Sequence, residues 1–329
     1  MAFTVAPTPA SAQRTDILVL YNGDHITGEI RSLHHGKLSY KTDDMGTLSI
    51  EWDEVARIRS VNVHEVVLVS GRRVFGPLHA PTEDGKLVVD PDTLSMSSVV
   101  EITPIEAGFV KRTDGYVDLG FTFAKANAAT TLHMDWQAHF RGPTWGGTIE
   151  GSSYLQRQDD ADPTSRNHGA LSAKRLVTGK VAGLAFFQAT QNDELNLNLR
   201  TNLGIGVDYR VVHSNRFEFG LVGGILTNRE RFADADSAIV SAEIITQMDF
   251  SAFRYDSPEL DFGTTLTPYF SVTKLGRVRI DLEIRGVYEI FDDFSLGIKF
   301  RDSFDSDPPD AAAIKNDYTT TFSIGWSWN

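Results

Sequence analysis

From about Gly115 to the last residue, apolar residues occupy every second position in a series of short segments, with polar or charged residues between them. The segment 196–210 shows this most clearly. One parity holds Leu197, Leu199, Leu203, Ile205, Val207 and Tyr209, and the other holds Asn196, Asn198, Arg200, Asn202, Asp208 and Arg210. Because successive side chains of a strand point to opposite faces, the segment predicts a strand with one apolar and one polar face.

The alternation recurs along the rest of the chain. The predicted strands are 115–124, 129–141, 144–157, 168–178, 181–191, 195–211, 215–228, 237–250, 258–273, 277–291, 293–302 and 316–329. Twelve is an even number, as in single-chain bacterial outer-membrane barrels. The pattern therefore predicts an all-β fold in which 115–329 form a 12-stranded antiparallel transmembrane β-barrel with its apolar face toward the outer-membrane lipids.

A soluble antiparallel sandwich is the rival interpretation, in which the apolar face is the core and the polar face meets water. Strand length separates the two. Soluble strands usually have about five or six residues, whereas a tilted membrane span needs about nine to eleven. The lengths of the predicted strands favour the barrel.

The polar parity collects ionisable residues, which in a barrel point into the lumen. The predicted lumen-lining residues are His133, Asp135, His139, Arg141, Glu150, Lys174, Arg200, Asp208, Arg210, Glu218, Glu243, Asp261, Arg277, Arg279, Asp281, Glu283, Arg285, Glu289, Lys299 and Arg301.

A barrel of eight strands is filled by its own side chains, and a barrel of sixteen leaves a water channel. In a barrel of twelve strands, the inward side chains therefore determine whether the lumen is open. Closed ion-pair networks would give a plugged, rigid anchor. Separate acidic and basic tracks would give a narrow pore for small charged solutes. Burying so many charges without water is costly, so we expect a hydrated lumen.

The links between predicted strands alternate in length. Long links include 158–167, 229–236 and 303–315, and short ones include 142–143, 179–180 and 212–214. Outer-membrane barrels have long outer loops and short periplasmic turns, which predicts that both the N-terminal region and the C-terminus are periplasmic. The outer links are acidic, with Asp159, Asp160, Asp162, Glu230, Asp234, Asp236, Asp302, Asp305, Asp307 and Asp310. Such oxygens can hold calcium or magnesium, but solvated loops are the favoured interpretation.

Residues 16–106 contain a duplicated unit. Gly36-Lys37-Leu38 recurs as Gly85-Lys86-Leu87, and Thr47-Leu48 recurs as Thr93-Leu94. Each copy reads as four or five short strands separated by Asn-Gly, Ser-Gly and similar turns. This predicts a small duplicated SH3/Sm-like β-domain, which 107–114 link to the barrel. Sm-like units often bind RNA, but the net charge of −13 and the lack of a basic stripe argue against a nucleic-acid partner. Docking of a periplasmic protein through 16–106 is the better interpretation.

Residues 1–15 are interpreted as a signal-peptide remnant or a disordered leader. Ala10-Ser11-Ala12 fits the small-x-small pattern of a secretory cleavage site. The upstream apolar part is short and has no basic start, so a Pro/Ala-rich leader is the alternative. Export would agree with a barrel in a Gram-negative outer membrane.

The chemistry-bearing residues do not form a recognisable catalytic motif. Absence of cysteine excludes thiol catalysis and Cys-ligated metals, and no nucleophile-elbow, Walker, zincin or dinucleotide motif occurs. His133, His139 and His168 lie near serines without an evident third orienting group. His34-His35 is a weak metal candidate and reads as an exposed turn. We therefore expect neither an enzyme nor a cofactor or metal site.

The last predicted strand carries aromatic residues on one parity. Phe322, Ile324, Trp326 and Trp328 alternate with Gly325 and Ser327. This resembles the C-terminal insertion signal that the barrel assembly machinery reads in outer-membrane proteins, although Asn329 follows the last aromatic residue.

A wider resemblance includes Tyr269-Phe270-Ser271, Leu275-Gly276-Arg277, Ile280-Asp281-Leu282 and Tyr288-Glu289-Ile290. With the closing Trp-rich strand, these segments resemble the salt-induced outer-membrane protein family, a domain family without assigned biochemical function. The resemblance covers 115–329. It implies an outer-membrane location and adaptation to salt or envelope stress, and it offers no catalytic residues.

The residues thus predict a porin-like outer-membrane protein. A narrow channel for small charged solutes or ions is the leading functional hypothesis. A plugged barrel that anchors a periplasmic protein-interaction domain is the second. A lipid-active outer-membrane enzyme is the third.

Overall fold

The computed structural model describes residues 15–105, 112–124, 129–158, 161–193, 197–233, 237–256, 258–291, 294–307 and 315–326. These residues form strands and two short 3-10 helices, which confirms the all-β prediction. No helix in the described part of the chain is long and apolar enough to cross a membrane. The chain divides into two compact units, one of Met1–Leu68 with Arg73–Pro104 and one of Val69–Arg72 with Ile105–Asn329. The predicted leader lies outside the described residues, apart from Thr15.

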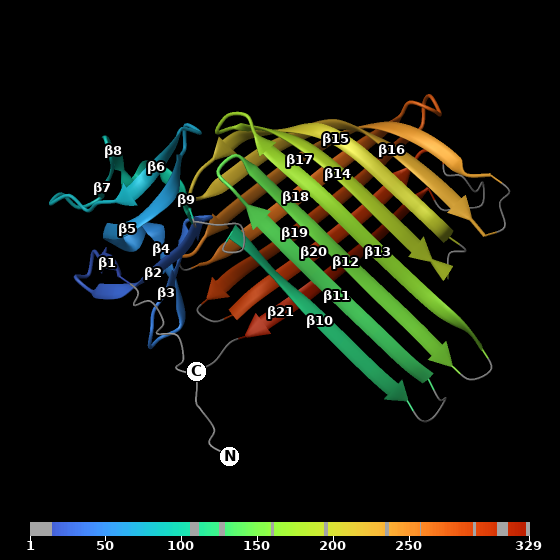
Figure 1. Ribbon diagram of the computed structural model, residues 1–329, viewed down its shortest axis with the longest axis horizontal. Coiled ribbons are helices and arrows are strands. Elements are labelled where there is room, and N and C mark those ends of the chain that lie inside the picture. The colour runs from blue at the N-terminus through green and yellow to red at the C-terminus, as the bar shows by residue number, and fades with distance from the viewer. Residues whose placement is uncertain are drawn as a thin grey trace, which may run out of the picture. The chain divides into compact units, whose positions relative to one another are not determined.

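The N-terminal unit is built around a small closed ring of strands. Its elements are β1 (Asp16–Leu20), β2 (His25–His34), β3 (Lys37–Lys41), β4 (Thr47–Glu51), η1 (Trp52–Glu54), β5 (Val55–Leu68), β6 (Arg73–Leu78), β7 (Lys86–Val89), β8 (Asp92–Ser95), η2 (Met96–Ser98) and β9 (Val99–Pro104). β1 pairs with β2 and β5, and β9 pairs with the same two strands, so these four close on themselves. β3 and β4 extend the sheet from β2, and β6 extends it from β5 (Figure 1).

The alternating apolar residues of these strands point into one core. Leu18, Leu38, Tyr40, Leu87 and Ile102 are fully buried in it. A carboxylate lies at its edge: Asp16 is 1% exposed and accepts hydrogen bonds from the Ile30 N–H (2.9 Å) and the Ser60 hydroxyl (2.5 Å). Those donors offset the cost of burying the charge.

Tyr40 adds a second polar group to this core. Its hydroxyl donates to the backbone oxygen of Asp16 at 2.7 Å. Burial raises the pKa of Tyr40 above its usual value, and the nearby Asp16 carboxylate raises it further. The ring therefore stays neutral, and it satisfies a backbone acceptor inside the core.

The two halves of this unit repeat the same local structure. In both, a hairpin with a positive-φ glycine (Gly36 or Gly85) precedes a 3-10 helix and then a strand. The Trp52 N–H bonds the Gly36 oxygen at 2.8 Å, and the Met96 N–H bonds the Gly85 oxygen at 2.9 Å. The Trp52 indole N–H donates to the Met96 oxygen, which links the two helices directly.

The two repeats form one continuous unit. β5 runs without a break from the end of the first repeat into the start of the second. Both repeats contribute side chains to one core cluster. A copy of about 45 residues has too little apolar area for a stable core of its own, which explains why the two copies share one.

The C-terminal unit is a single antiparallel sheet of twelve strands, each paired with the next in the chain, as the sequence predicts. They are β10 (Thr113–Ala124), β11 (Ala129–Arg141), β12 (Trp145–Gln158), β13 (Ala161–Leu176), β14 (Val181–Asn192), β15 (Leu197–His213), β16 (Phe217–Phe232), β17 (Ile239–Arg254), β18 (Leu260–Ser271), β19 (Val278–Phe291), β20 (Phe294–Asp305) and β21 (Asn316–Trp326). One predicted boundary is wrong by seven residues, because β13 begins at Ala161 rather than at 168. Its polar first half pairs with β12, as in Gln156 opposite Thr164.

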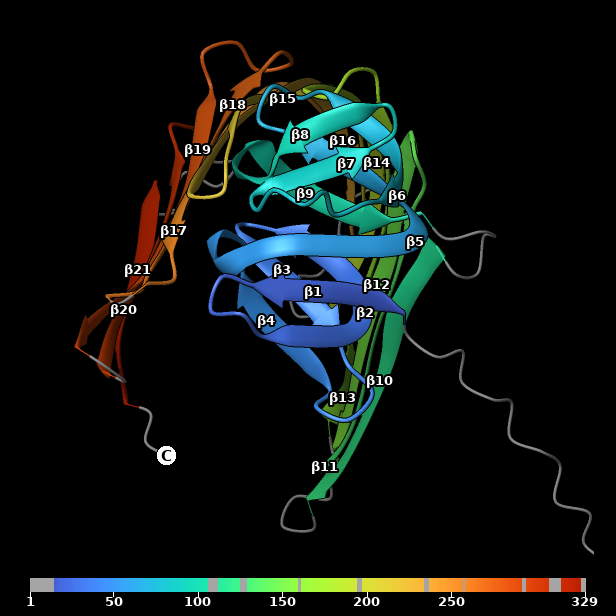
Figure 2. The same cartoon turned by 90° about the vertical axis from the view of Figure 1, so that its left-hand side faces the viewer.

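The sheet curves but is not closed. β10 and β21 are its two edges, and no pairing joins them within the described residues. Figure 2 shows the two strands on opposite sides of the curved sheet. Every described residue of β21 is exposed, as is every residue of β10 after Thr113. The sheet itself is thus confirmed, and closure into a barrel is not seen.

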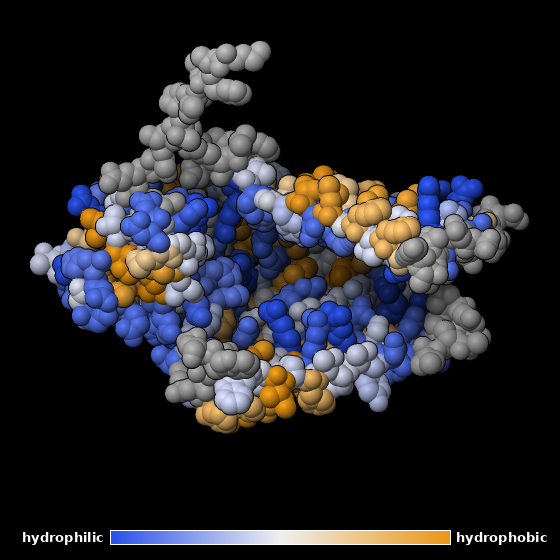
Figure 3. All heavy atoms as spheres, turned by 90° about the horizontal axis from the view of Figure 1, so that it is seen from below, coloured by the Kyte–Doolittle hydropathy of each residue, from blue (hydrophilic) through white to orange (hydrophobic). Residues whose placement is uncertain are grey.

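The two faces of this sheet differ in polarity. Leu119 is 68% exposed, Leu203 57% and Phe322 76%, and all three lie on the outer, convex face. Figure 3 shows hydrophilic side chains together with some hydrophobic ones within the hollow of the curved sheet, and hydrophobic side chains on its outside. Many large apolar residues of these strands are therefore on the surface, the reverse of their arrangement in the N-terminal unit.

Candidate functional site

The strand register brings the predicted lumen residues to one face of the sheet. Directly opposed residues of neighbouring strands share a face. Glu283, for example, lies opposite Thr265 on one side and Arg301 on the other, and Thr265 lies opposite Asp249. Following such pairs across all twelve strands places every predicted lumen residue within a strand on this concave face. Arg277 precedes β19 and shares its inward parity with Arg279.

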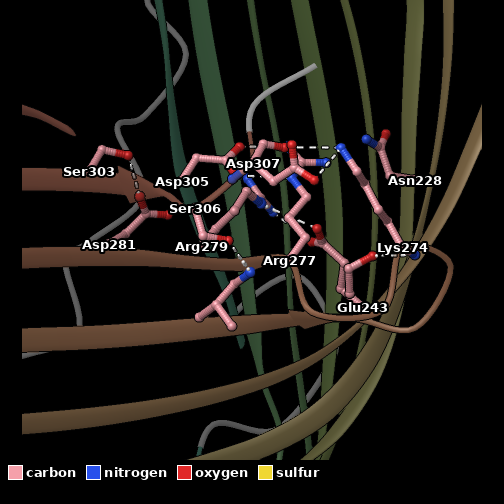
Figure 4. A network of polar contacts seen from close by, with 12 residues as sticks. Asn228, Glu243, Lys274, Arg277, Arg279, Asp281, Ser303, Asp305, Ser306 and Asp307 are labelled. Carbon is pink, nitrogen blue, oxygen red and sulfur yellow. Dashed lines mark hydrogen bonds and ion pairs between the residues drawn. The ribbon is translucent and has the colours of Figure 1, made fainter. Parts of the chain in front are cut away.

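Two arginines at one end of β19 form an ion-pair network on the polar face (Figure 4). Arg279 donates from Nε and Nη2 to Glu243, at 3.2 and 2.6 Å. Arg277 makes the same two-pronged contact with Asp305, at 3.0 and 2.5 Å. Paired guanidinium–carboxylate bonds of this kind are strong and directional. They connect β17, β19 and β20 across the concave face.

The neighbours of this pair extend the network. Lys274 Nζ lies 2.6 Å from an oxygen of Asp307. The Arg279 guanidinium also stacks over the Tyr269 ring, 4.5 Å from its centroid. Glu243 is only 4% exposed, so removing its arginine partner would leave a buried charge uncompensated.

Other charged pairs lie along the wall between nearby strands. Lys174 contacts Asp208 at 2.5 Å, Arg200 contacts Glu230 at 2.7 Å, and Arg301 contacts Glu283 at 3.0 Å. His133 contacts Asp135 on its own strand, and His213 Nε2 lies 2.8 Å from Glu218. Most of these bonds run along the wall, so they hold strands together without crossing the hollow.

Two inward cations lack an acidic partner among the described residues. Arg285 and Lys299 lie directly opposite one another on β19 and β20, and both are exposed. On the other edge of the sheet, two carboxylates, Asp118 and Asp135, oppose each other in the same way. Like charges in directly opposed positions repel. The concave face therefore carries one unbalanced basic pair and one acidic pair.

A cavity of about 770 Å³ lies along β17–β21 on this face. Its acidic lining includes Asp249, Asp281, Glu283 and Asp317, and its basic lining includes Arg285 and Arg301. Hydroxyl groups complete it: Thr265 donates to Asp249, and Ser303 donates to Asp281. The wall thus offers charged groups of both signs rather than an apolar pocket.

The structure corrects the prediction of acidic outer loops. Glu230 is within β16 and binds Arg200, and Asp305 ends β20 and binds Arg277. Asp302 is within β20 on the convex face, opposite Leu282 and Tyr318. Asp159, Asp160, Asp234, Asp236 and Asp310 lie outside the described residues. The acids that are described therefore serve mainly as strand-end partners of basic residues.

The histidines considered for catalysis form no hydrogen bond with serine in the described part of the chain. His139 Nδ1 lies 3.0 Å from the Thr148 hydroxyl, and His168 Nδ1 lies 3.1 Å from that of Thr190. Both are cross-strand contacts of a sheet surface.

The predicted insertion signal lies on the convex edge of the sheet. Phe322, Ile324 and Trp326 are 76%, 72% and 67% exposed on β21. Trp328 lies outside the described residues. Sequence reasoning missed Tyr269, Lys274 and Asp249 as parts of the polar face, although their parity within the strands or their place beside the β18–β19 turn was a usable signal.

The twelve-stranded sheet corresponds to a known protein family. Residues 117–328 match the family described as proteins of unknown function, DUF481. The chain belongs to the DUF481 family. The match begins within β10 and excludes the N-terminal unit, so the family is defined by the twelve-stranded sheet. The predicted resemblance to a domain family without assigned biochemical function is confirmed to that extent.

Other comparisons add little. No curated protein matches the chain. One solved structure, a bacterial polysaccharide outer membrane secretin, aligns with 82% of this chain and 97% of its own at 9% identity and a TM-score of 0.39. A likeness this weak carries no argument about fold or function.

Proposed function

We propose that this DUF481 protein is a bacterial outer-membrane β-barrel whose hydrated lumen passes small charged solutes or ions. The observation that carries the proposal is the separation of faces across all twelve strands. Ionisable residues line the concave face, and exposed aliphatic and aromatic residues cover the convex one. A spanning barrel requires this arrangement, whereas exposed apolar patches of such extent are rare on a soluble monomer.

Assigning the convex face to lipid also requires the sheet to close into a barrel. In hydrocarbon, each backbone group without a partner costs several kcal/mol, so an open sheet edge cannot face lipid. The edge strands β10 and β21 each turn about half of their backbone N–H and C=O groups to the open side of the sheet. If the convex face meets lipid, these edges must pair, and the sheet becomes a barrel.

The wall chemistry supports an open lumen rather than a plug. The pairs Lys174–Asp208, Arg200–Glu230 and Glu283–Arg301 lie along the wall. Charged groups that remain exposed on it need water, because burying them dry would be costly. Arg285 and Lys299 then add positive charge to the lumen wall, which favours anions over cations.

The remaining parts of the proposal concern location and partners. We place the N-terminal unit and the C-terminus in the periplasm, with biogenesis through the barrel assembly machinery. The N-terminal unit is proposed to dock a periplasmic protein. A link to salt or envelope stress is proposed from the sequence resemblance. No catalytic step is part of this function.

Single-channel recording of the purified protein in planar bilayers tests the channel. We expect discrete openings and a selectivity that moves toward cations in Lys299→Glu. Arg31→Glu makes the same kind of charge reversal at an exposed site of the N-terminal unit (side chain 51% exposed) and serves as the matched control. It should leave conductance and selectivity unchanged.

The second candidate is a plugged anchor that presents the N-terminal unit. The Arg277–Asp305 and Arg279–Glu243 pairs favour it, because they brace one end of the wall. Protein that inserts into bilayers but shows no openings would overturn the channel and support the anchor.

A further inference from the structure

The free edges of the twelve-stranded sheet match one another in one particular register. We propose that β10 and β21 pair antiparallel with Asp118 directly opposite Ser323, which closes the barrel with a displacement of fourteen residues around its circumference. This inference rests on the proposed barrel and specifies how its seam is built.

The faces of the two edge strands restrict the register first. On β10 the convex face carries Val117, Leu119, Phe121 and Phe123, all with odd numbers. On β21 it carries Tyr318, Phe322, Ile324 and Trp326, all with even numbers. A pairing that keeps both apolar sets outside must therefore oppose odd with even positions. A shift by one residue would turn one strand inside out, so only steps of two residues are allowed.

The registers of the existing strand pairs restrict the register of the seam further. A row of directly opposed convex-face residues crosses the sheet, and its members are Thr113, Phe140, Gly147, Ala173, Ala185, Ile205, Ile225, Ile244, Phe270 and Val278. The neighbouring convex-face row, two residues further along β19, consists of Ile280, Phe304 and Asn316. The first row therefore meets the extended axis of β21 two residues before Asn316. With Asp118 opposite Ser323, continuing the first row across the seam brings it back to the extended axis of β10 fourteen residues beyond Thr113.

This displacement sets the strand tilt. Fourteen residues at about 3.3 Å each, over twelve strands spaced about 4.8 Å, correspond to a tilt of about 39°. Barrel strands tilt by about 35–45°. Shifting the seam by two residues one way gives about 35°, at the lower limit. Shifting it the other way gives about 43° but shortens the overlap of β10 (Thr113–Ala124) with β21 (Asn316–Trp326). The register with Asp118 opposite Ser323 satisfies both conditions.

Charge complementarity supports the same seam. The basic pair Arg285–Lys299 continues through Thr321, which this register places opposite Gly120. The acidic pair Asp118–Asp135 is then in the adjacent row. Thr321 and Gly120 are small, so the long Lys299 side chain can reach across them. Closure would thus bring the basic pair Arg285–Lys299 beside the acidic pair Asp118–Asp135.

Cysteine cross-linking of the full chain in lipid vesicles tests the register, because the protein has no cysteine of its own. The test variant is Asp118→Cys with Ser323→Cys. Asp118→Cys with Thr321→Cys and Asp118→Cys with Gly325→Cys are matched controls that keep all thiols on the inner face. Ser303→Cys with Asp317→Cys, a pair already opposed in β20 and β21, is the positive control. Directly opposed Cβ atoms lie about 4.5–5.5 Å apart and diagonal ones about 7–8 Å, whereas a disulfide needs about 3.5–4.5 Å.

We expect mild oxidation to give an intrachain disulfide in the 118/323 variant at least several-fold faster than in either offset control. Faster intrachain cross-linking in an offset control would overturn this register and leave the closed barrel standing. Cross-linked dimers would show that the edges pair with a second copy, which contradicts the barrel itself. Absence of any seam cross-link while Ser303→Cys/Asp317→Cys reacts would also contradict the barrel.

Discussion

The two units of this chain use the same alternating pattern in opposite ways. In the N-terminal unit, Leu38 and Tyr40 are fully buried in a common core. In the twelve-stranded sheet, Leu119 and Phe322 are 68% and 76% exposed on the convex face. A strand pattern alone thus specifies which residues share a face, but the surroundings decide whether the apolar face turns inward or outward. The proposed function accounts for the difference by two solvents, water around the first unit and lipid around the second.

The largest expected effect is loss of a core side chain in the N-terminal unit. Leu38→Ala should lower the free energy of unfolding of that unit by about 2–5 kcal/mol, because it leaves a cavity in a packed core. Hydrogen exchange of 16–104 in the intact protein measures it. Val61→Ala, at a site 64% exposed, is the control and should cost less than about 0.5 kcal/mol. Similar losses at both sites would mean that the unit has no such core.

A charge on the convex face of the sheet should be nearly as costly, but only in lipid. Leu203→Arg should destabilise the protein in vesicles by about 2–4 kcal/mol, as an arginine does near the middle of a bilayer. Its neighbour Asn202 faces inward, opposite Gln188 and Asn228, so Asn202→Arg should cost far less. Urea unfolding in vesicles compares the two, and equal costs would argue against a lipid-facing convex surface.

The polar face should depend most on its least exposed carboxylate. Glu243→Gln weakens both bonds from Arg279 and should lower the unfolding free energy by about 1–3 kcal/mol, the range for hydrogen bonds to charged groups. Glu283→Gln changes a pair whose side chains are 42% and 59% exposed, and should cost less than about 1 kcal/mol. The same unfolding assay measures both variants. A larger loss of unfolding free energy in Glu283→Gln than in Glu243→Gln would contradict the stabilising role of Glu243.

The smallest effect concerns pH in the N-terminal unit. Because burial raises the pKa of Tyr40 in the folded state, the unfolded chain loses this proton first as pH rises. Stability from Tyr40 is therefore complete below about pH 10 and falls above it, by at most about 1.4 kcal/mol per pH unit. Hydrogen exchange above pH 10 should show this slope in the wild type and a shallower one in Tyr40→Phe. Identical slopes would contradict the burial effect.

Much of the sheet could be predicted because its information is local. The alternation around Leu203 fixes a strand and its faces without knowledge of any partner. The start of β13 was harder, since Asp162, Pro163 and Thr164 resemble a loop in composition. Pairing with β12 keeps that stretch extended nonetheless, and a hairpin that extends beyond the apolar band has no hydrophobic signal.

The contacts of the polar face could not be predicted in the same way. Arg279 and Glu243 lie on strands separated by β18, so their pairing depends on the registers of two strand pairs together. An error in the register of either strand pair would place the Arg279 and Glu243 side chains apart. The shared core of the N-terminal unit has the same cause: the repeats are visible in the sequence, but the continuity of β5 through both is a property of the packed unit.

The central claim is that adjacent side chains of one strand lie in different solvents. Single-cysteine variants Leu203→Cys and Asn202→Cys, labelled with an environment-sensitive fluorophore, test it in vesicles that carry spin-labelled acyl chains. The account predicts strong quenching by the lipid probe at 203 and weak quenching at 202. Equal quenching at both positions, or none at 203, would contradict it.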